Sequence, residues 1–422
     1  MAQKYFDLDK ESGEKMKTIM IAIPGAADYP AEELGGRTPF EIAKLPNLHY
    51  FSKIGKVGTV KLVADRLEPS ADVTLLNFLG YDADKVYTGR GPLEAANLEL
   101  KLEDNEVAFR MNFITESNGF LADATAGSIA TKEAKALINF LNKKLASDFV
   151  RFFAGEEYRH IAVLKDSHGF EALSAKTVAP KQIEGDAIDL HLPKGPGEEL
   201  LKKLMYDAKL LLQSHEINQV RLDLNENPAN MIWLWGQGKR PQLEKFSDRF
   251  GLSGALLSDR EYAHGIARIA GLTVLEISGA EDVSERYKNV GKLLIEVAQE
   301  KDFVCLTLEA CHEAAEDGDY KGKVSALEAM DFFIFSKVRE FMENSKDVRV
   351  LVSPCHTLPW KMKKCTRDAV PFVMAGKNIM PDDIEKFSEL TAKASNLKFN
   401  KGSDLLKQLF QVEAKPVLSG KS

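Results

Sequence analysis

The last third of the chain carries side chains that could bind a metal ion. His312 and Glu316 are four residues apart and share one face if their segment is helical. Cys355-His356 directly follows an apolar run, and Cys365 lies nine residues beyond the histidine. Imidazole, carboxylate and thiolate groups are all zinc ligands. These spacings match no zinc signature, so an acidic, solvated loop with a few buried thiols is the alternative interpretation.

A second set of side chains suits an oxyanion. In residues 68–96 an apolar run ends in Gly-Tyr-Asp and is followed by the turn Thr-Gly-Arg-Gly at 88–91. Backbone N–H groups at a turn and the guanidinium of Arg90 favour phosphate or carboxylate. An ordinary helix end followed by a loop would give the same pattern. Four other cations lie beside turns and are equally consistent with surface ion pairs: Arg110, Arg159, Arg221 and Lys239.

Composition excludes several classes of function. The net charge is −7, and no basic tract suggests binding to nucleic acid. Apolar runs such as 18–24 and 332–335 are far too short to span a membrane. Residues 1–15 are polar and are expected to form a flexible leader rather than a signal peptide, which predicts a cytoplasmic protein. All four cysteines lie after residue 300, and no disulfide set is expected in that compartment.

The elements that must position these residues form an α/β pattern at both ends of the chain. The apolar runs at 17–23, 303–309 and 348–352 predict buried parallel strands, whose carboxyl ends hold sites in open α/β sheets. Between them, residues 99–122 and 158–195 are typical of antiparallel strands. At 422 residues, two domains are expected, with one inserted into a loop of the other.

Several long stretches together carry a resemblance to a known family. They are ELGGRTPFEIAKLPNL, FLGYD, YTGRGPLEAA, VAFRMNF, GEEYRH, PANMIWLWGQGKRP, EDGDYKGKV and DAVP, and they span nearly the whole chain from Met16. The chain resembles the archaeal-type 2,3-bisphosphoglycerate-independent phosphoglycerate mutases, within the alkaline phosphatase superfamily. A bacterial branch of this family is often described as homoserine kinases. The resemblance alone therefore leaves the substrate open.

The resemblance implies both a fold and a reaction. The implied fold is an alkaline-phosphatase-like α/β core domain, here 16–88 plus 288–422, with a smaller inserted α+β substrate domain at 89–287. The implied reaction is the glycolytic conversion of 3-phosphoglycerate to 2-phosphoglycerate, an isomerisation. A serine nucleophile carries the phosphoryl group, and two manganese or magnesium ions activate it. Arginines of the inserted domain hold the carboxylate and phosphate.

The reactive positions implied by the family are changed in this sequence. Pro24 stands where the family has a metal-binding aspartate. Counting back from Asp82 places the serine nucleophile at Ala71, with Asp72 retained after it. Ser70 is one residue early, and one residue of slip at the start of a helix turns a side chain by about 100°. Ser70 is therefore a poor substitute.

The remaining metal positions keep only one family residue. His312 and Glu316 stand where the family has aspartate and histidine, Cys355 replaces an aspartate and Cys365 replaces the final histidine. Only His356 is unchanged. Six binding-type residues are retained: Arg90, Arg110, Asn112, Arg159, Arg221 and Lys292.

Three outcomes follow from this pattern. The leading expectation is a pseudoenzyme or repurposed subunit that binds no metal or other cofactor and retains a site for a small phosphorylated or carboxylated ligand. The second is an active phosphotransferase with one re-ligated site at His312, Glu316 and Cys365, best suited to zinc. The third is a structural partner in a larger complex.

Overall fold

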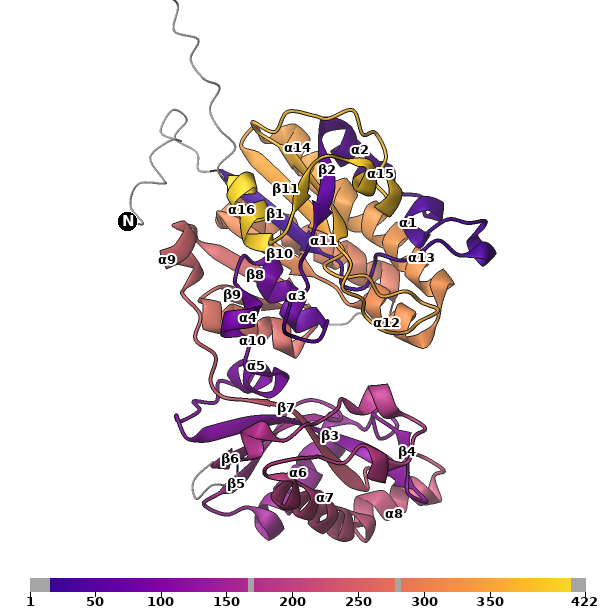
Figure 1. Cartoon of the computed structure of the whole chain (residues 1–422), viewed down its shortest axis with the longest axis vertical. Helices are drawn as coiled ribbons and strands as arrows, with labels where there is room; N and C mark the ends of the chain where they lie inside the picture. The colour runs from indigo at the N-terminus through magenta and orange to yellow at the C-terminus, as the bar shows by residue number, and fades with distance from the viewer. Residues whose placement is uncertain (1–15, 166–170, 278–281, 411–422) are drawn as a thin grey trace, which may run out of the picture. The chain divides into compact units, whose positions relative to one another are not determined.

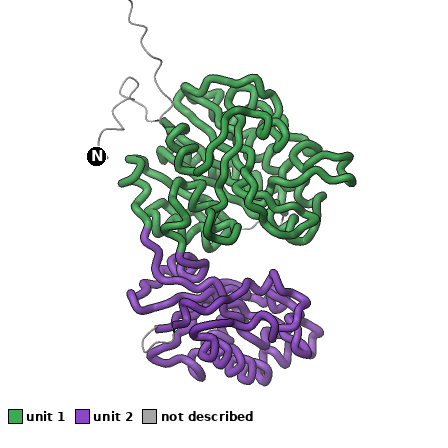
Figure 2. Tube along the Cα trace, in the orientation of Figure 1, with its two compact units in different colours: residues 1–87, 243–422 green, residues 88–242 purple. Residues whose placement is uncertain are grey.

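The computed structural model describes residues 16–165, 171–277 and 282–410; the expected leader at 1–15 lies outside them. The chain divides into two compact units (Figure 2): unit 1 is 1–87 with 243–422, and unit 2 is 88–242. The expected insertion began at 89, one residue from this division. Its expected end at 287 is corrected to 242, because residues 254–276 pair with the main sheet and not with the inserted one.

Within its described residues, unit 1 is built on one mixed sheet of eight strands (Figure 1). In spatial order these are β13 (Lys398–Phe399), β2 (Gly55–Val60), β12 (Val370–Gly376), β11 (Val348–Ser353), β1 (Lys17–Ala22), β10 (Phe303–Thr307), β8 (Gly254–Ser258) and β9 (Thr273–Glu276). The run from β11 to β9 is parallel, whereas β12 is antiparallel to both neighbours. The predicted strands at 17–23, 303–309 and 348–352 are confirmed as β1, β10 and β11.

Helices cover both faces of this sheet (Figure 1), which explains why the central strands β1, β10 and β11 are buried along almost their whole length. The helices of unit 1 are α1 (Pro39–Ile42), α2 (Pro46–Ile54), α3 (Ala71–Phe78), α4 (Ala83–Val86), α9 (Phe246–Phe250), α10 (Glu261–Ala270), α11 (Val283–Glu300), α12 (Ala310–Asp317), α13 (Tyr320–Met330), α14 (Ser336–Asn344), α15 (Glu389–Ala394) and α16 (Gly402–Phe410). A π-helical turn at Asp331–Phe335 joins α13 to α14. The main core packs β1, β10 and β11 against α11 and α13.

Unit 2 has its own sheet and its own core. Its strands are β3 (Glu106–Ser117), β4 (Phe120–Asp123), β5 (Val150–Ala154), β6 (Arg159–Lys165) and β7 (Met231–Gly238). Its helices are α5 (Arg90–Asn97), α6 (Thr131–Leu145), α7 (Glu198–Gln213) and α8 (Glu216–Asp223). The odd-numbered residues of β3 from Val107 to Phe113 pack in a core with α6 and α7, and the even-numbered Ala108 packs with α5.

The expectation of strands over 158–195 is correct only for β6. Among the described residues, the rest of this stretch contains three short 3₁₀ turns, at Ala172–Ser174, Pro180–Ile183 and Ile188–Leu190. Proline has no N–H to give to a sheet, and the left-handed Gly185 turns the chain sharply. The buried apolar residues between such breakers therefore pack into the core of unit 2 without pairing along a strand.

Candidate functional site

The candidate metal ligands lie after the parallel strands of unit 1, as the sequence predicts. Pro24-Gly25 follows β1, α12 follows β10, and Cys355-His356 follows β11. Gly25 has a φ of +68°, and a Cβ there would lie 2.8 Å from the His312 Cα. The bare backbone of Gly25 thus lets α12, and with it His312, lie directly against the loop that follows β1.

The structure brings three of the predicted ligands together. His312, His356 and Cys365 each offer one ligand atom, and these atoms all lie within 4.8 Å of one another. The Nδ1 of His312 is 3.0 Å from the Nε2 of His356. The predicted set of His312, Glu316 and Cys365 differs from this group in one member, because His356 occupies the inner position.

The outer nitrogen of each imidazole has its own partner. His312 Nε2 lies 3.3 Å from the carboxylate oxygen Oε1 of Glu316, one turn further along α12. His356 Nδ1 lies 3.2 Å from the hydroxyl of Thr74 on α3. Glu316 is therefore close to the group but faces the nitrogen that points away from it.

Burial and neighbouring charges together set the protonation of this group. Burial and the neighbouring His312 hold the pKa of His356 well below its ordinary value. Burial opposes a charge on His312 as well, but the carboxylates of Glu309 and Glu316 raise its pKa above the ordinary value. Burial raises the pKa of the Cys365 thiol to about 12, so without a cation beside it this sulfur stays protonated.

The position implied for the nucleophile adjoins this group. Ala71 is the first residue of α3, and the Thr74 hydroxyl that faces His356 also contacts the carbonyl oxygens of Ser70 and Ala71. Ser70 is the N-cap, and its side chain makes no capping hydrogen bond. The buried Asp72 accepts a hydrogen bond of 2.9 Å from the hydroxyl of Tyr87. The side chain at 71 is a methyl group without a nucleophilic atom.

Two further predicted metal positions are not suited to an ion. Pro24 has no donor atom in its side chain. Cys355 has a φ of +62°, and its buried sulfur contacts the carbonyl oxygen of Ser353 at 3.9 Å. Burial raises the pKa of the Cys355 thiol well above its ordinary value. The residues present therefore do not fit a pair of manganese or magnesium ions, which prefer several oxygen ligands.

Sequence reasoning missed a buried carboxylate beside the two histidines. Glu309 follows β10, is buried, and its Oε2 lies 4.0 Å from His312 Nδ1. Its other oxygen accepts a hydrogen bond from the hydroxyl of Tyr262 on α10. The sequence could have identified Glu309, because it lies at the carboxyl end of a predicted parallel strand, where the functional residues of such sheets are located.

Four of the predicted anion-binding residues lie together on unit 2. Arg110 and Asn112 share one face of β3, and Arg159 of β6 is paired directly with Asn112. Arg90 begins α5, which packs on β3, and its Nε lies 2.7 Å from Glu94. Arg110 binds the other oxygen of the same carboxylate. We call Arg90, Arg110, Asn112 and Arg159 the arginine cluster.

Hydrogen bonds hold the arginine cluster in place. Asn112 Oδ1 accepts from Arg110 Nε at 3.0 Å and from the indole N–H of Trp235 at 3.1 Å. Arg159 pairs with Glu157 at 2.8 Å. Three guanidinium groups thus lie together in fixed positions, and such groups bind carboxylate or phosphate through paired N–H donors.

Arg221 and Lys292 have other surroundings. Arg221 is 4% exposed and donates to the carbonyl oxygens of Ala126 and Asn227 and to Glu133, so it fastens the loop before α6. Lys292 belongs to unit 1, where its side chain on α11 is 78% exposed and lies 3.8 Å from Glu296. The structure therefore gives Arg221 a structural role and places Lys292 on a solvated helix face.

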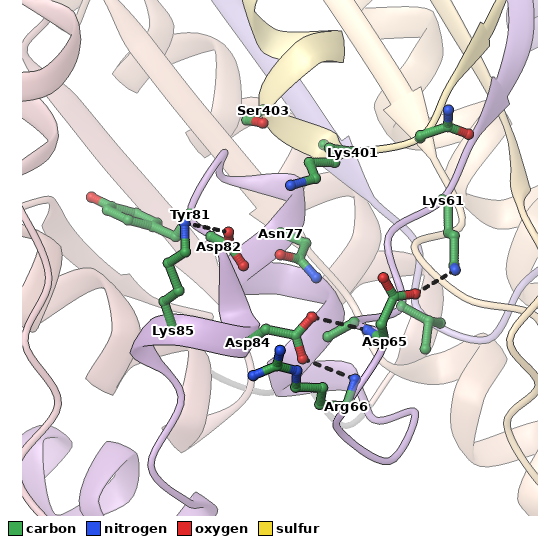
Figure 3. A pocket seen from close by; sticks show the side chains of 14 residues that line it. Lys61, Asp65, Arg66, Asn77, Tyr81, Asp82, Asp84, Lys85, Lys401 and Ser403 are labelled. Atoms are coloured by element: carbon green, nitrogen blue, oxygen red, sulfur yellow. Dashed lines mark hydrogen bonds and ion pairs between the residues drawn. The ribbon is translucent and has the colours of Figure 1, made fainter.

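A separate pocket lies at the other end of α3 (Figure 3). Its volume is about 300 Å³, and Asn77, the start of α4 and the start of α16 contribute to its wall. Ion pairs on its wall join Lys61 with Asp65 at 2.6 Å and Lys85 with Asp82 at 3.2 Å. Its lining includes none of the residues predicted from the sequence as ligands.

Among the described residues, every helix is too short or too polar to cross a membrane.

Comparisons with known proteins agree with this architecture. Residues 52–218 match the model of the 2,3-bisphosphoglycerate-independent phosphoglycerate mutase family. The mutase of that name from Methanothrix thermoacetophila is 35% identical over 396 residues, covering 93% of this chain and 99% of the relative. A probable mutase of the same kind from Geobacter sulfurreducens is 34% identical over 93% of this chain and 99% of the relative.

Two solved structures share the fold. A protein of Pyrococcus horikoshii superposes with a TM-score of 0.75 at 23% identity, covering 95% of this chain and 99% of that one. The cofactor-independent phosphoglycerate mutase from Thermoplasma acidophilum gives a TM-score of 0.60 at 22% identity, covering 94% and 100%. The predicted α/β fold class is thereby confirmed.

Proposed function

We propose a function from the premise that this chain belongs to the 2,3-bisphosphoglycerate-independent phosphoglycerate mutase family. We infer that it is a cytoplasmic pseudoenzyme, which binds a small phosphorylated or carboxylated ligand but does not transfer a phosphoryl group. The observation that carries this proposal is Ala71. It begins α3 beside the histidines of unit 1, at the position the resemblance assigns to the nucleophile, and offers only a methyl group.

The changes around Ala71 support loss of the whole reaction. The two-ion centre implied by the family would need donors at Pro24, Ala71 and Cys355, and the first two have none. Nucleophile and ligands in such centres act as a unit, so losing several together removes the rate far more completely than losing one. Thr74 is no replacement nucleophile, because it is fully buried and its hydroxyl donates to the backbone carbonyls of α3.

The arginine cluster supports retained binding. Guanidinium groups bind carboxylate and phosphate through paired N–H donors, and their geometry is most effective when neighbours fix it beforehand. Glu94 fixes both Arg90 and Arg110, and Asn112 fixes Arg110 a second time. A small ligand with one or two anionic groups matches the paired N–H donors of these guanidinium groups.

A mutase assay tests the loss of phosphotransfer. Conversion of 3-phosphoglycerate to 2-phosphoglycerate is measured with manganese at high protein concentration, for the natural chain, for Ser70→Ala and for Ser214→Ala. Ser214 is an exposed serine at the end of α7 and serves as the matched control. We expect no turnover above that of the buffer. Manganese-dependent turnover that Ser70→Ala abolishes and Ser214→Ala retains would establish the alternative, an active mutase with an unusual site.

Calorimetric titration with 3-phosphoglycerate tests the retained binding. We expect saturable binding that Arg90→Gln weakens about tenfold or more, since a charge-assisted hydrogen bond contributes about 1.5–3 kcal/mol. Lys292→Gln, which removes one exposed cation of unit 1, should leave the affinity unchanged. Absence of binding to the natural chain would contradict the proposal and favour the third outcome, a structural partner in a larger complex.

A further inference from the structure

The inner nitrogen of His312 is available as a metal ligand. Its outer nitrogen, Nε2, lies 3.3 Å from Glu316 Oε1. An ionised carboxylate can only accept a hydrogen bond, so Nε2 carries the proton in this contact. The neutral imidazole then has its lone pair on Nδ1, the atom that faces His356.

The same argument applies to His356 through a different partner. The Thr74 hydroxyl lies 3.0 Å from the Ser70 carbonyl and 3.2 Å from the Ala71 carbonyl, and carbonyl oxygens only accept. The single hydroxyl proton of Thr74 is therefore directed to the backbone of α3. Its oxygen accepts a hydrogen bond from His356 Nδ1–H at 3.2 Å, which leaves the lone pair of His356 on Nε2.

The two inner nitrogens face each other across 3.0 Å. Two facing lone pairs repel, so either a proton or a metal cation must lie between or beside these nitrogens. Two nitrogens bound to one tetrahedral zinc ion at 2.0–2.1 Å are about 3.3 Å apart, close to the observed separation. Outer partners that fix each ring in this way are the usual surroundings of metal-binding histidines.

Cys365 supplies a third metal-ligand atom beside the two histidine nitrogens. Its ligand atom completes the group that lies within 4.8 Å. Cys365 and His356 both come from the connection between β11 and β12, whereas His312 comes from α12. The buried carboxylate of Glu309 borders the group at 4.0 Å from His312 Nδ1 and adds negative charge. Thiolate with imidazole favours zinc over magnesium or manganese.

We propose that unit 1 binds one zinc ion through His312 Nδ1, His356 Nε2 and Cys365 Sγ. The site combines residues from both metal positions implied by the family and does not include the nucleophile position. It goes beyond the proposed function, since zinc here needs neither phosphotransfer nor the arginine cluster. The chemical alternative is a single proton shared between the two imidazoles.

Metal analysis and cobalt substitution test the site. Untagged protein is stripped with a chelator, equilibrated with zinc, dialysed and analysed for metal; a second sample receives cobalt and is examined by absorption spectroscopy. We expect about one zinc per chain and, with cobalt, the intense visible bands of a tetrahedral ion together with a thiolate charge-transfer band. Neither measurement depends on mutase activity or on the binding of 3-phosphoglycerate.

Two cysteine variants sharpen the test. Cys365→Ser should abolish the charge-transfer band and weaken zinc binding at least about tenfold. Cys311→Ala is the matched control, because Cys311 is the buried neighbour of His312 but its sulfur contacts the Lys323 carbonyl at 3.8 Å; it should keep the band. Less than about a tenth of a zinc per natural chain would overturn the proposal in favour of the shared proton. A charge-transfer band that persists in Cys365→Ser would overturn the assigned ligand.

Discussion

At the scale of single residues, the hydrogen-bond partners of His312 and His356 determine which ring nitrogens are free to bind a metal. Glu316 and Thr74 hold the outer nitrogens of His312 and His356, so the inner nitrogens converge. The sequence predicted all three members of the observed group as candidates, because each follows a parallel strand or occupies a family position. It could not predict which nitrogen faces inward, since that depends on side-chain rotation and on Thr74, which lies far away in the sequence.

Thr74→Val tests the outer partner of His356. Valine keeps the shape of threonine but cannot accept the Nδ1–H hydrogen bond, so His356 loses the contact that fixes its lone pair. We expect zinc affinity, measured by competition with a chelating dye, to fall about 10–100-fold. Thr74→Ser restores the hydroxyl and should bind zinc nearly as well as the natural chain. Equal affinity in all three proteins would contradict this role of Thr74.

Glu389 makes stability depend on pH. It accepts hydrogen bonds from Thr38 Oγ1 at 2.6 Å and from the Asp28 N–H at 2.9 Å, and burial raises its pKa from 4.5 to about 7. Between these values the folded state binds more protons than the unfolded state, so stability falls as pH rises. We expect a loss of about 2–3 kcal/mol between pH 5 and pH 8, measured by chemical denaturation.

Glu389→Gln mimics the protonated acid and should flatten this dependence. Glu385→Gln, an exposed change nearby, should keep the slope of the natural chain. A natural chain whose stability is constant from pH 5 to pH 8 would contradict the assignment.

At the scale of elements, one buried ion pair joins the segments that surround the site. Lys323 of α13 is fully buried, binds the carboxylate of Asp28 after β1, and donates to the Leu358 carbonyl after β11 at 2.9 Å. Trp360 N–H donates to the same carboxylate at 3.2 Å. The loops after β1 and β11 are thereby fastened to each other and to α13.

Lys323→Met tests this junction. Methionine fills a similar volume but leaves the Asp28 charge buried without its cation, which costs about 3–5 kcal/mol in other proteins. We expect a loss of stability of that size in thermal or chemical unfolding. Lys321→Met, an exposed change on the first turn of α13, should shift stability by less than about 0.5 kcal/mol. A Lys323→Met protein as stable as the Lys321→Met control would disprove the role of the pair.

Local patterns predicted most individual elements but not their partners. The apolar runs that became β1, β10 and β11 were evident. The stretch 253–280 also has a clear strand–helix–strand pattern. Its membership in unit 1 rests on the pairing of β8 with β10, a contact across the sequence that no local pattern reveals. The C-terminal end of the inserted domain was therefore predicted at 287, too late in the sequence.

At the scale of the whole molecule, unit 2 has the attributes of an independent domain. It is continuous from 88 to 242, and its sheet, α6 and α7 share one core. We expect residues 88–242 expressed alone to unfold in one cooperative thermal transition, followed by circular dichroism. A segment ending at 287, which adds β8, α10 and β9 without their partner β10, should be less soluble, because it exposes an unpaired apolar strand. A non-cooperative transition for 88–242 would contradict this division.

The two ends of unit 2 lie against each other. The Thr88 hydroxyl donates to the Lys239 carbonyl, and a Cβ at Gly89 would lie 2.2 Å from the Gln237 carbonyl oxygen. To the rest of the chain, the whole of unit 2 is thus equivalent to one short surface loop. A single recombination event can therefore insert, replace or remove a domain such as unit 2 without changing the sheet of unit 1. The ligand-binding residues of unit 2 and the metal-binding residues of unit 1 can consequently evolve independently of each other.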